Sequence, residues 1–219
     1  MKAMLYADWM VFRQSFRSLL FVIVVFIATA FISGKTTFFS FIVVFLSIMT
    51  PTTLFAADKA YGWNRLSLVL PILRRDVVGS KFIMGALINF AMLAVGLVIN
   101  VIYAAYEPSA VLVENIGGML ACEAVALLMM GVLMVLSFRF GIEKARYIII
   151  ACVWVPVLGM FVLEKLAVVQ TAMHTAARWL DSAEDGQFVF VLTAALVVSL
   201  VVYALCCLIS VRIYQKTEL

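Results

Sequence analysis

Residues 188–211 form an apolar run that contains no charged side chain. Five other apolar runs occupy residues 19–32, 38–57, 82–106, 116–137 and 147–163. A helix that crosses a bilayer needs about 20 predominantly apolar residues, and only helices or closed barrels satisfy their backbone hydrogen bonds in lipid. Strands of a membrane barrel would alternate apolar and polar residues, and these runs do not. The sequence therefore predicts an all-α polytopic membrane protein with six transmembrane helices.

Composition supports a chain whose solvent is lipid. Hydrophobic residues make up 66% of it and charged residues 13%, against roughly 45–50% and about 25% in soluble domains. The cysteines all fall inside apolar runs, and none has a metal-ligand or CxxC spacing, so we expect neither a disulfide framework nor a metal site. These cysteines are Cys122, Cys152, Cys206 and Cys207.

The basic residues predict the topology. Positive charge concentrates in cytoplasmic loops, and both termini, the 58–81 insert and the 138–146 loop fall on one side if all six runs cross. This arrangement predicts a multi-pass protein of a bacterial cytoplasmic membrane with both termini in the cytoplasm. That side holds thirteen of the sixteen lysines and arginines: Lys2, Arg13, Arg17, Lys59, Arg65, Arg74, Arg75, Lys81, Arg139, Lys144, Arg146, Arg212 and Lys216.

Residues 1–17 predict an amphipathic helix that lies in the membrane interface. Leu5, Trp9, Phe12 and Phe16 are spaced to share one helical face, and basic residues lie between them. We expect the aromatic rings at the boundary of the acyl chains. A simple polar leader is the alternative.

Two polar stretches interrupt the apolar runs. The insert at 58–81 is strongly basic, whereas the stretch at 164–187 is predicted to be an interfacial or re-entrant segment on the opposite side. The latter contains His174, which we interpret as an ordinary interfacial residue. We expect one transmembrane domain over 1–219, with 1–17, 58–81 and 164–187 as its non-spanning parts.

Three polar side chains fall within the predicted spans. Asn89 and Asn100 share a helical face with small residues, which indicates either helix packing or a translocation path. Glu123 is the only carboxylate well inside an apolar run. A charge at that depth is by default a functional hypothesis, but Glu123 lies about two turns from the acidic 107–115 loop and could also reach the interface.

No catalytic constellation is visible in the sequence. It contains no GxSxG or HExxH motif and no paired carboxylates within a span, so we expect no enzyme activity. The amphipathic leader and the basic inserts are instead features that a membrane subunit driven by a soluble motor would need.

The leader and insert resemble a known family. The resemblance rests on Leu5–Trp9 (LYADW), on Asp58-Lys59 with Gly62–Arg65 (GWNR), and on Leu70–Ile72 (LPI), Arg74, Val77-Val78 and Ser80-Lys81. The chain is similar to a permease subunit of the ABC-2 exporter family, of the small six-span kind. Within that family it resembles the permease of the phenol-soluble modulin exporter, which expels amphipathic peptides.

The resemblance implies a two-part transporter. Two permease subunits, here expected to be a homodimer, would form the pore, and each would contact an ATP-binding subunit through a coupling helix in the insert. ATP and Mg would bind the partner, with no cofactor in this chain. An aromatic anchor ringed by arginines suits such a contact, although Trp63 could also be an interfacial belt residue. The residues expected to bind the partner are Trp63, Asn64, Arg65, Leu70, Pro71, Arg74, Arg75, Arg139 and Lys144.

The mostly apolar spans favour an amphipathic peptide, lipid-like or drug-like substrate for this exporter. The leading alternative is the substrate-binding membrane subunit of a vitamin importer, against which the lack of an AxxxA motif in the first span counts. A membrane anchor without transport activity is a third possibility.

Overall fold

The computed structural model describes residues 2–33, 37–63, 73–106, 112–151 and 185–216. Five helices account for most of them: α1 (Lys2–Ser33), α2 (Thr37–Ala60), α4 (Arg74–Tyr106), α5 (Leu112–Phe140) and α8 (Asp185–Lys216). A further helix begins at residue 142 and continues to 151. The described part of the chain contains no strand, which confirms the all-α class.

Three helices are long and apolar enough to cross a membrane among the residues described: Arg74–Ile102, Asn115–Phe140 and Phe190–Lys216. They correspond to the predicted third, fourth and sixth spans, and most of each predicted span falls within them. Most of the predicted fifth span and most of the 164–187 segment lie outside the described residues. Six spans therefore remain a prediction.

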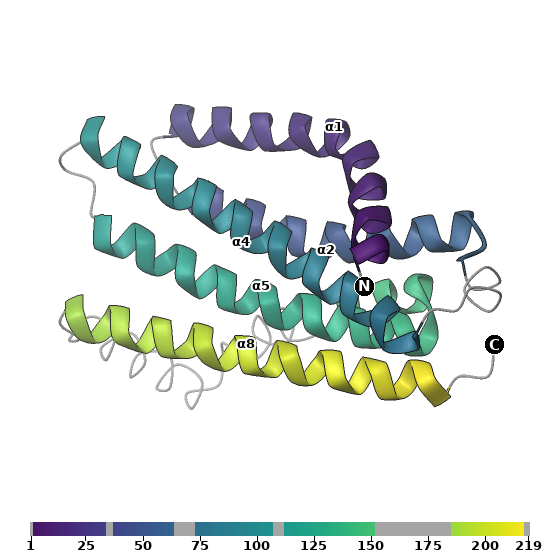
Figure 1. The fold of residues 1–219 in the computed structure, drawn as a ribbon. Helices are drawn as coiled ribbons and strands as arrows, with labels where there is room; N and C mark the ends of the chain where they lie inside the picture. The colour runs from purple at the N-terminus through teal and green to yellow at the C-terminus, as the bar shows by residue number, and fades with distance from the viewer. Residues whose placement is uncertain (1, 34–36, 64–72, 107–111, 152–184, 217–219) are drawn as a thin grey trace.

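Helices α2, α4, α5 and α8 run side by side, and α5 packs against each of the other three (Figure 1). Four helix ends lie together at one end of this bundle (Figure 1). They are the beginning of α1, the end of α2, the beginning of α4 and the end of α8. This end carries the residues predicted to face the cytoplasm. Which side of a membrane it faces stays a prediction.

The leader is the first part of α1 rather than a separate helix. Helix α1 continues without interruption from Lys2 to Ser33 but bends sharply, so that its first turns cross the ends of other helices (Figure 1). Met4 is buried in a cluster with Phe82, Met130 and Tyr214. The leader is thus packed against the bundle end.

Residues 138–146 were predicted to be a loop, and this prediction is wrong because nearly all of them are helical. Helix α5 extends to Phe140, and the next helix begins at residue 142. Only Gly141 breaks the path, with a φ of 82° that glycine adopts without steric cost. Its N–H donates to the Ser137 carbonyl, and its own carbonyl accepts from Ala145 N–H. One residue therefore ends one helix and begins the next.

Small residues on α4 let α5 approach closely. A Cβ placed on Gly85 would lie 2.8 Å from Met134 Cε and 3.0 Å from Met130 Sδ, and one on Gly96 would meet Met119 Cε. Small residues at membrane helix contacts commonly serve this purpose. The face of α4 that contains Asn89 and Asn100 is thus a packing face in this structure.

We expect Gly85→Leu to lower stability by about 1–3 kcal/mol, because overpacking forces neighbouring side chains out of their rotamers. Thermal unfolding of the detergent-solubilised protein measures this loss. Gly118→Leu is the matched control, since a Cβ at Gly118 meets nothing within 4 Å. Equal melting of the two variants would show that the α4–α5 contact is not as close as described.

Candidate functional site at the bundle end

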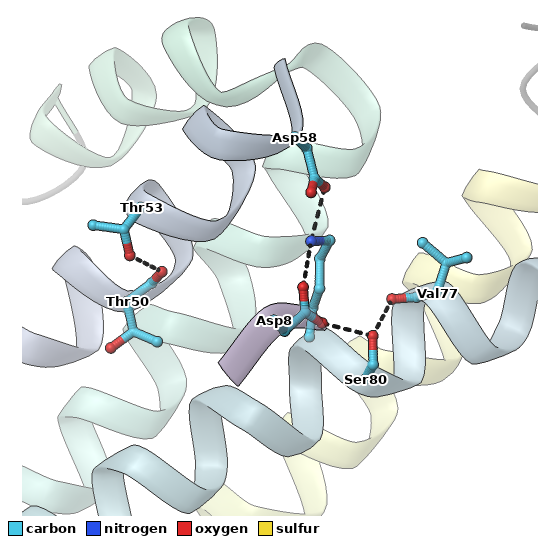
Figure 2. Close-up of polar contacts among 7 residues, drawn as sticks. Asp8, Thr50, Thr53, Asp58, Val77 and Ser80 are labelled. Atoms are coloured by element: carbon cyan, nitrogen blue, oxygen red, sulfur yellow. Dashed lines mark hydrogen bonds and ion pairs between the residues drawn. The ribbon is translucent and has the colours of Figure 1, made fainter. Parts of the chain in front are cut away.

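A buried lysine joins three helices at the bundle end. Lys81 Nζ lies 2.7 Å from Asp58 Oδ2 and 3.3 Å from Asp8 Oδ1. The Lys81 side chain is 2% exposed, and those of Asp8 and Asp58 are 10% and 23% exposed. Figure 2 shows Asp8 from α1 and Asp58 from α2 reaching toward the same point beside the first turns of α4. We call these three residues the ionic cluster.

The second oxygen of Asp8 is also bound. Ser80 Oγ donates to Asp8 Oδ2 at 2.8 Å (Figure 2). Lys81 Nζ in addition lies 5.4 Å from the centre of the Phe55 ring, within the range of a cation–π contact. Buried charges persist when they are paired and their remaining hydrogen-bonding positions are filled. The cluster meets this condition on both the Asp8 and the Lys81 side.

The cluster closes the base of the 58–81 insert. Asp58 is the first residue of the insert and Lys81 the last. The ion pair between them therefore joins the two chain segments, on α2 and α4, between which the insert lies. Asp8 ties the leader to the same point. A displacement of the insert must therefore move α1, α2 and α4 together or break a buried ion pair.

Arg74 extends these contacts to α8. Its Nη1 donates to the Gln215 carbonyl at 2.9 Å and to the Tyr214 carbonyl at 3.4 Å. The last carbonyls of a helix have no partner within the helix and carry partial negative charge, so a guanidinium stabilises them. The first residue of α4 thus caps the end of α8.

A cavity of about 320 Å³ lies next to the ionic cluster. Its walls come from the end of α2, the turn after it, α4, α5, the Gly141 turn and α8. Aromatic side chains alternate in it with charged ones. The lining residues include Phe55, Asp58, Lys59, Trp63, Lys81, Phe138 and Tyr214.

The pKa values of two carboxyl groups near the cavity shift in opposite directions, that of the partly buried Asp58 upward and that of the exposed Glu143 downward. Burial raises the pKa of Asp58 above its ordinary value, while the charge of Lys81 and its hydrogen bond oppose the rise. On acidification Asp58 therefore takes up its proton earlier than an exposed aspartate. On the outside, a hydrogen bond from Lys59 at 2.5 Å lowers the pKa of Glu143, and this pair joins α2 to the helix after Gly141.

The residues predicted to bind a partner differ in how far they are exposed, and some lie outside the described residues. Trp63 is half-buried, lines the cavity and packs against the cluster of Met4 and Phe82. Arg75, Arg139 and Lys144 are exposed at the same end of the bundle. Asn64, Arg65, Leu70 and Pro71 lie outside the described residues. The partner contact itself stays a prediction.

The predicted interface residues of the leader do not share one environment. Phe12 is buried among Leu46, Leu54, Met84 and Ile88, whereas Trp9 is 45% exposed and Leu5 is half-buried. The side chain of Phe16 lies outside the described residues. The leader thus places Met4, Asp8 and Phe12 toward the protein, and contact of its other side with lipid remains a prediction.

The polar residues of the spans are buried. Asn89 Oδ1 accepts from Ser47 Oγ on α2 at 2.8 Å. Asn100 Nδ2 donates to the Gly96 carbonyl and lies 2.9 Å from Met119 Sδ on α5. Glu123 is fully buried, and neither of its oxygens has a hydrogen-bond partner among the described residues. Both asparagines bridge or approach a neighbouring helix, and a role of either in translocation stays a prediction.

Sequence reasoning missed the ionic cluster as a unit. One signal was present, because Lys81 lies four and eight residues before Gly85 and Asn89, on the face of α4 that packs against other helices. A lysine on such a face requires a counter-charge. The sequence could not say that Asp8, 73 residues away, would supply one.

The comparison with known families bears directly on this architecture. The family described as ABC-2 family transporter protein matches residues 3–215, nearly the whole chain. The chain belongs to the ABC-2 transporter family. No curated protein and no solved structure matches it.

Membership identifies the chain as the membrane-spanning permease of an ABC transporter. The family resemblance predicted from the leader and the insert is confirmed at this level. The match extends over both the leader and α8, so the residues of the bundle end described above lie within the matched region. The vitamin-importer alternative gains no support from it.

We expect Lys81→Met to destabilise the permease by about 3–5 kcal/mol, because removal of one partner leaves buried carboxylates unpaired. Thermal unfolding in detergent measures the effect. Lys59→Met is the control, since Lys59 and Glu143 are exposed and such surface pairs contribute at most about 1 kcal/mol. Similar melting temperatures for the two variants would contradict the burial of the cluster.

Proposed function

We propose that this permease is the membrane subunit of an ATP-driven exporter and that the 58–81 insert couples it to a separate ATP-binding subunit. The observation that carries the proposal is the ionic cluster. It joins the two ends of the insert to each other and to the leader, so a force applied to the insert reaches three helices at once. A loop whose two ends were not joined in this way would change its own conformation under the force and would not move the helices.

The proposed docking surface consists of the insert and the exposed basic residues beside it. Trp63, which lines the cavity, supplies an aromatic anchor, and the exposed Arg75, Arg139 and Lys144 supply positive charge at the same end of the bundle. Aromatic and arginine side chains are enriched among residues that dominate binding energies. An acidic or mixed surface on the ATP-binding subunit would complement this end of the bundle.

Movement of the insert would then reach the spans through α4. Its first residue holds the end of α8, and its glycines bring it into close contact with the methionines of α5. Interfaces this closely packed shift between discrete arrangements rather than deform continuously. ATP binding and hydrolysis, with Mg, would take place on the partner, which pushes the insert as its two copies close.

The translocation path is proposed to form between two copies of the permease. Helix α8 presents large apolar side chains with more than half of their surface exposed, including Phe190, Val198 and Leu208. Such a face suits lipid or a second copy. The described spans offer few charged groups, and this favours an amphipathic peptide, lipid-like or drug-like substrate.

Co-purification tests the coupling role. We expect the Trp63→Ala/Arg75→Glu variant to bind the ATP-binding subunit at least about 30-fold more weakly than wild type, since loss of a hot spot costs 2 kcal/mol or more. Arg75 is exposed, so its reversal leaves the bundle intact. The measurement is capture of the partner by the solubilised permease at several partner concentrations.

Two controls separate docking from folding. Phe190→Ala removes an exposed aromatic at the opposite end of the bundle and should leave capture unchanged. Arg74→Glu breaks the contact with α8 and should lower the melting temperature as well as capture. Undiminished capture by the Trp63→Ala/Arg75→Glu variant would place the partner elsewhere.

A further inference from the structure

Glu123 lies deep in the bundle, and among the described residues nothing binds its carboxyl group. It is eight residues into the Asn115–Phe140 span, which corresponds to about 12 Å along the helix axis. Its side chain is 0% exposed, and both carboxyl oxygens lack a hydrogen-bond donor among the described residues. The side chains around this position on α5, Met119, Ala124 and Leu127, are apolar.

No described cation is available to Glu123 from the helices that pack against α5. The basic residues of α2, α4 and α8 lie at the opposite end of the bundle, where the ionic cluster is (Figure 1). The helix after Gly141 also packs against α5, and its basic residues, Lys144 and Arg146, lie in its first turns at that same end. Near the beginnings of α5 and α8 the sequence carries acids. On α2, α4, α5 and α8 the charged and titratable residues are Asp58, Lys59, Arg74, Arg75, Asp76, Lys81, Tyr103, Tyr106, Glu114, Cys122, Arg139, Asp185, Tyr203, Cys206, Cys207, Arg212, Tyr214 and Lys216.

Physical chemistry restricts what Glu123 can be in this state. Ionisation of an isolated carboxylate in a low-dielectric interior is costly, and such a group takes up a proton instead. An organic cation or a hydrated ion would need space beside the carboxyl, and a side chain with no exposed surface has none. A proton needs no cavity.

We propose that Glu123 is a proton-binding site of the permease, neutral while the helix bundle is packed around it and ionised when its helices separate. In the packed state the carboxyl group keeps its O–H bond. When the helices part and water enters, this bond breaks, the electron pair stays on the carboxylate, and water accepts the proton. The packed form of the bundle is thereby linked to pH through one proton, independently of the coupling role of the insert.

Infrared spectroscopy tests the protonation state directly. The difference spectrum of wild type minus Glu123→Gln, taken at neutral pH in lipid, should show a carboxylic-acid carbonyl band. Glu143→Gln is the matched control, because Glu143 is exposed and paired with Lys59, and its difference spectrum should show carboxylate bands instead. A carboxylate signature for Glu123 would overturn the proposal, and Glu123→Ala serves as a second subtraction if the glutamine variant does not fold.

The pH dependence of unfolding gives an independent measure. The folded protein would keep a proton that the unfolded chain releases above the ordinary glutamate pKa of about 4.3. The unfolding equilibrium constant of wild type should therefore rise, relative to that of Glu123→Gln, about tenfold per unit of pH above that value. A ratio that stays constant or falls with pH would contradict the assignment.

Discussion

The structure depends on the burial of one positive charge. A lysine ammonium cannot remain ionised in a protein interior without counter-charges, and Lys81 obtains them from two helices that are distant in sequence. This requirement fixes the end of α2 against the beginning of α4, and it holds the leader across both. Arg74, about two turns earlier, then sets the position of α8. The bundle end is thus assembled by a few buried or partly buried charges, whereas the spans are assembled by the shape of apolar side chains.

The two ends of α4 serve different purposes in this arrangement. At its beginning, α4 is held to α1, α2 and α8 by ion pairs and hydrogen bonds, which depend on the direction between donor and acceptor and weaken quickly when the helices shift. Farther along, glycines of α4 lie in close contact with methionines of α5, and flexible methionine side chains can adopt more than one packed arrangement. A helix built this way can receive movement at one end and alter its packing along the rest. Along α5, Glu123 lies between Met119 and Met130, which meet Gly96 and Gly85 of α4; under our proposal a change in this packing would admit water to it.

Much of this fold could be predicted from hydropathy, and the exceptions have physical reasons. The helical class and the approximate spans follow from apolar runs, because lipid leaves the backbone no alternative. The predicted helix boundaries differ from the observed ones by several residues, because α4, α5 and α8 continue as helices beyond their apolar segments. The polar side chains of these extensions can form hydrogen bonds with water. The interior packing of Phe12 could not be foreseen, because an aromatic residue on an amphipathic helix suits a membrane interface as well as a protein core. The face of α4 was visible in the spacing of Gly85, Asn89 and Asn100, yet its extension back to Lys81 required knowledge of which carboxylates lie nearby.

The central claim is that the leader, the end of α2 and the beginning of α4 move as one body when the ATP-binding subunit acts. Distances between spin labels at Tyr6 and Tyr61, which are both exposed, test it in the assembled transporter with and without trapped nucleotide. The account predicts that the Tyr6–Tyr61 distance distribution stays the same within a permease, while the distance between the copies of Tyr61 in the proposed homodimer changes. A shift in the Tyr6–Tyr61 distance on nucleotide trapping would show that the ionic cluster does not hold these segments together, and it would contradict the account.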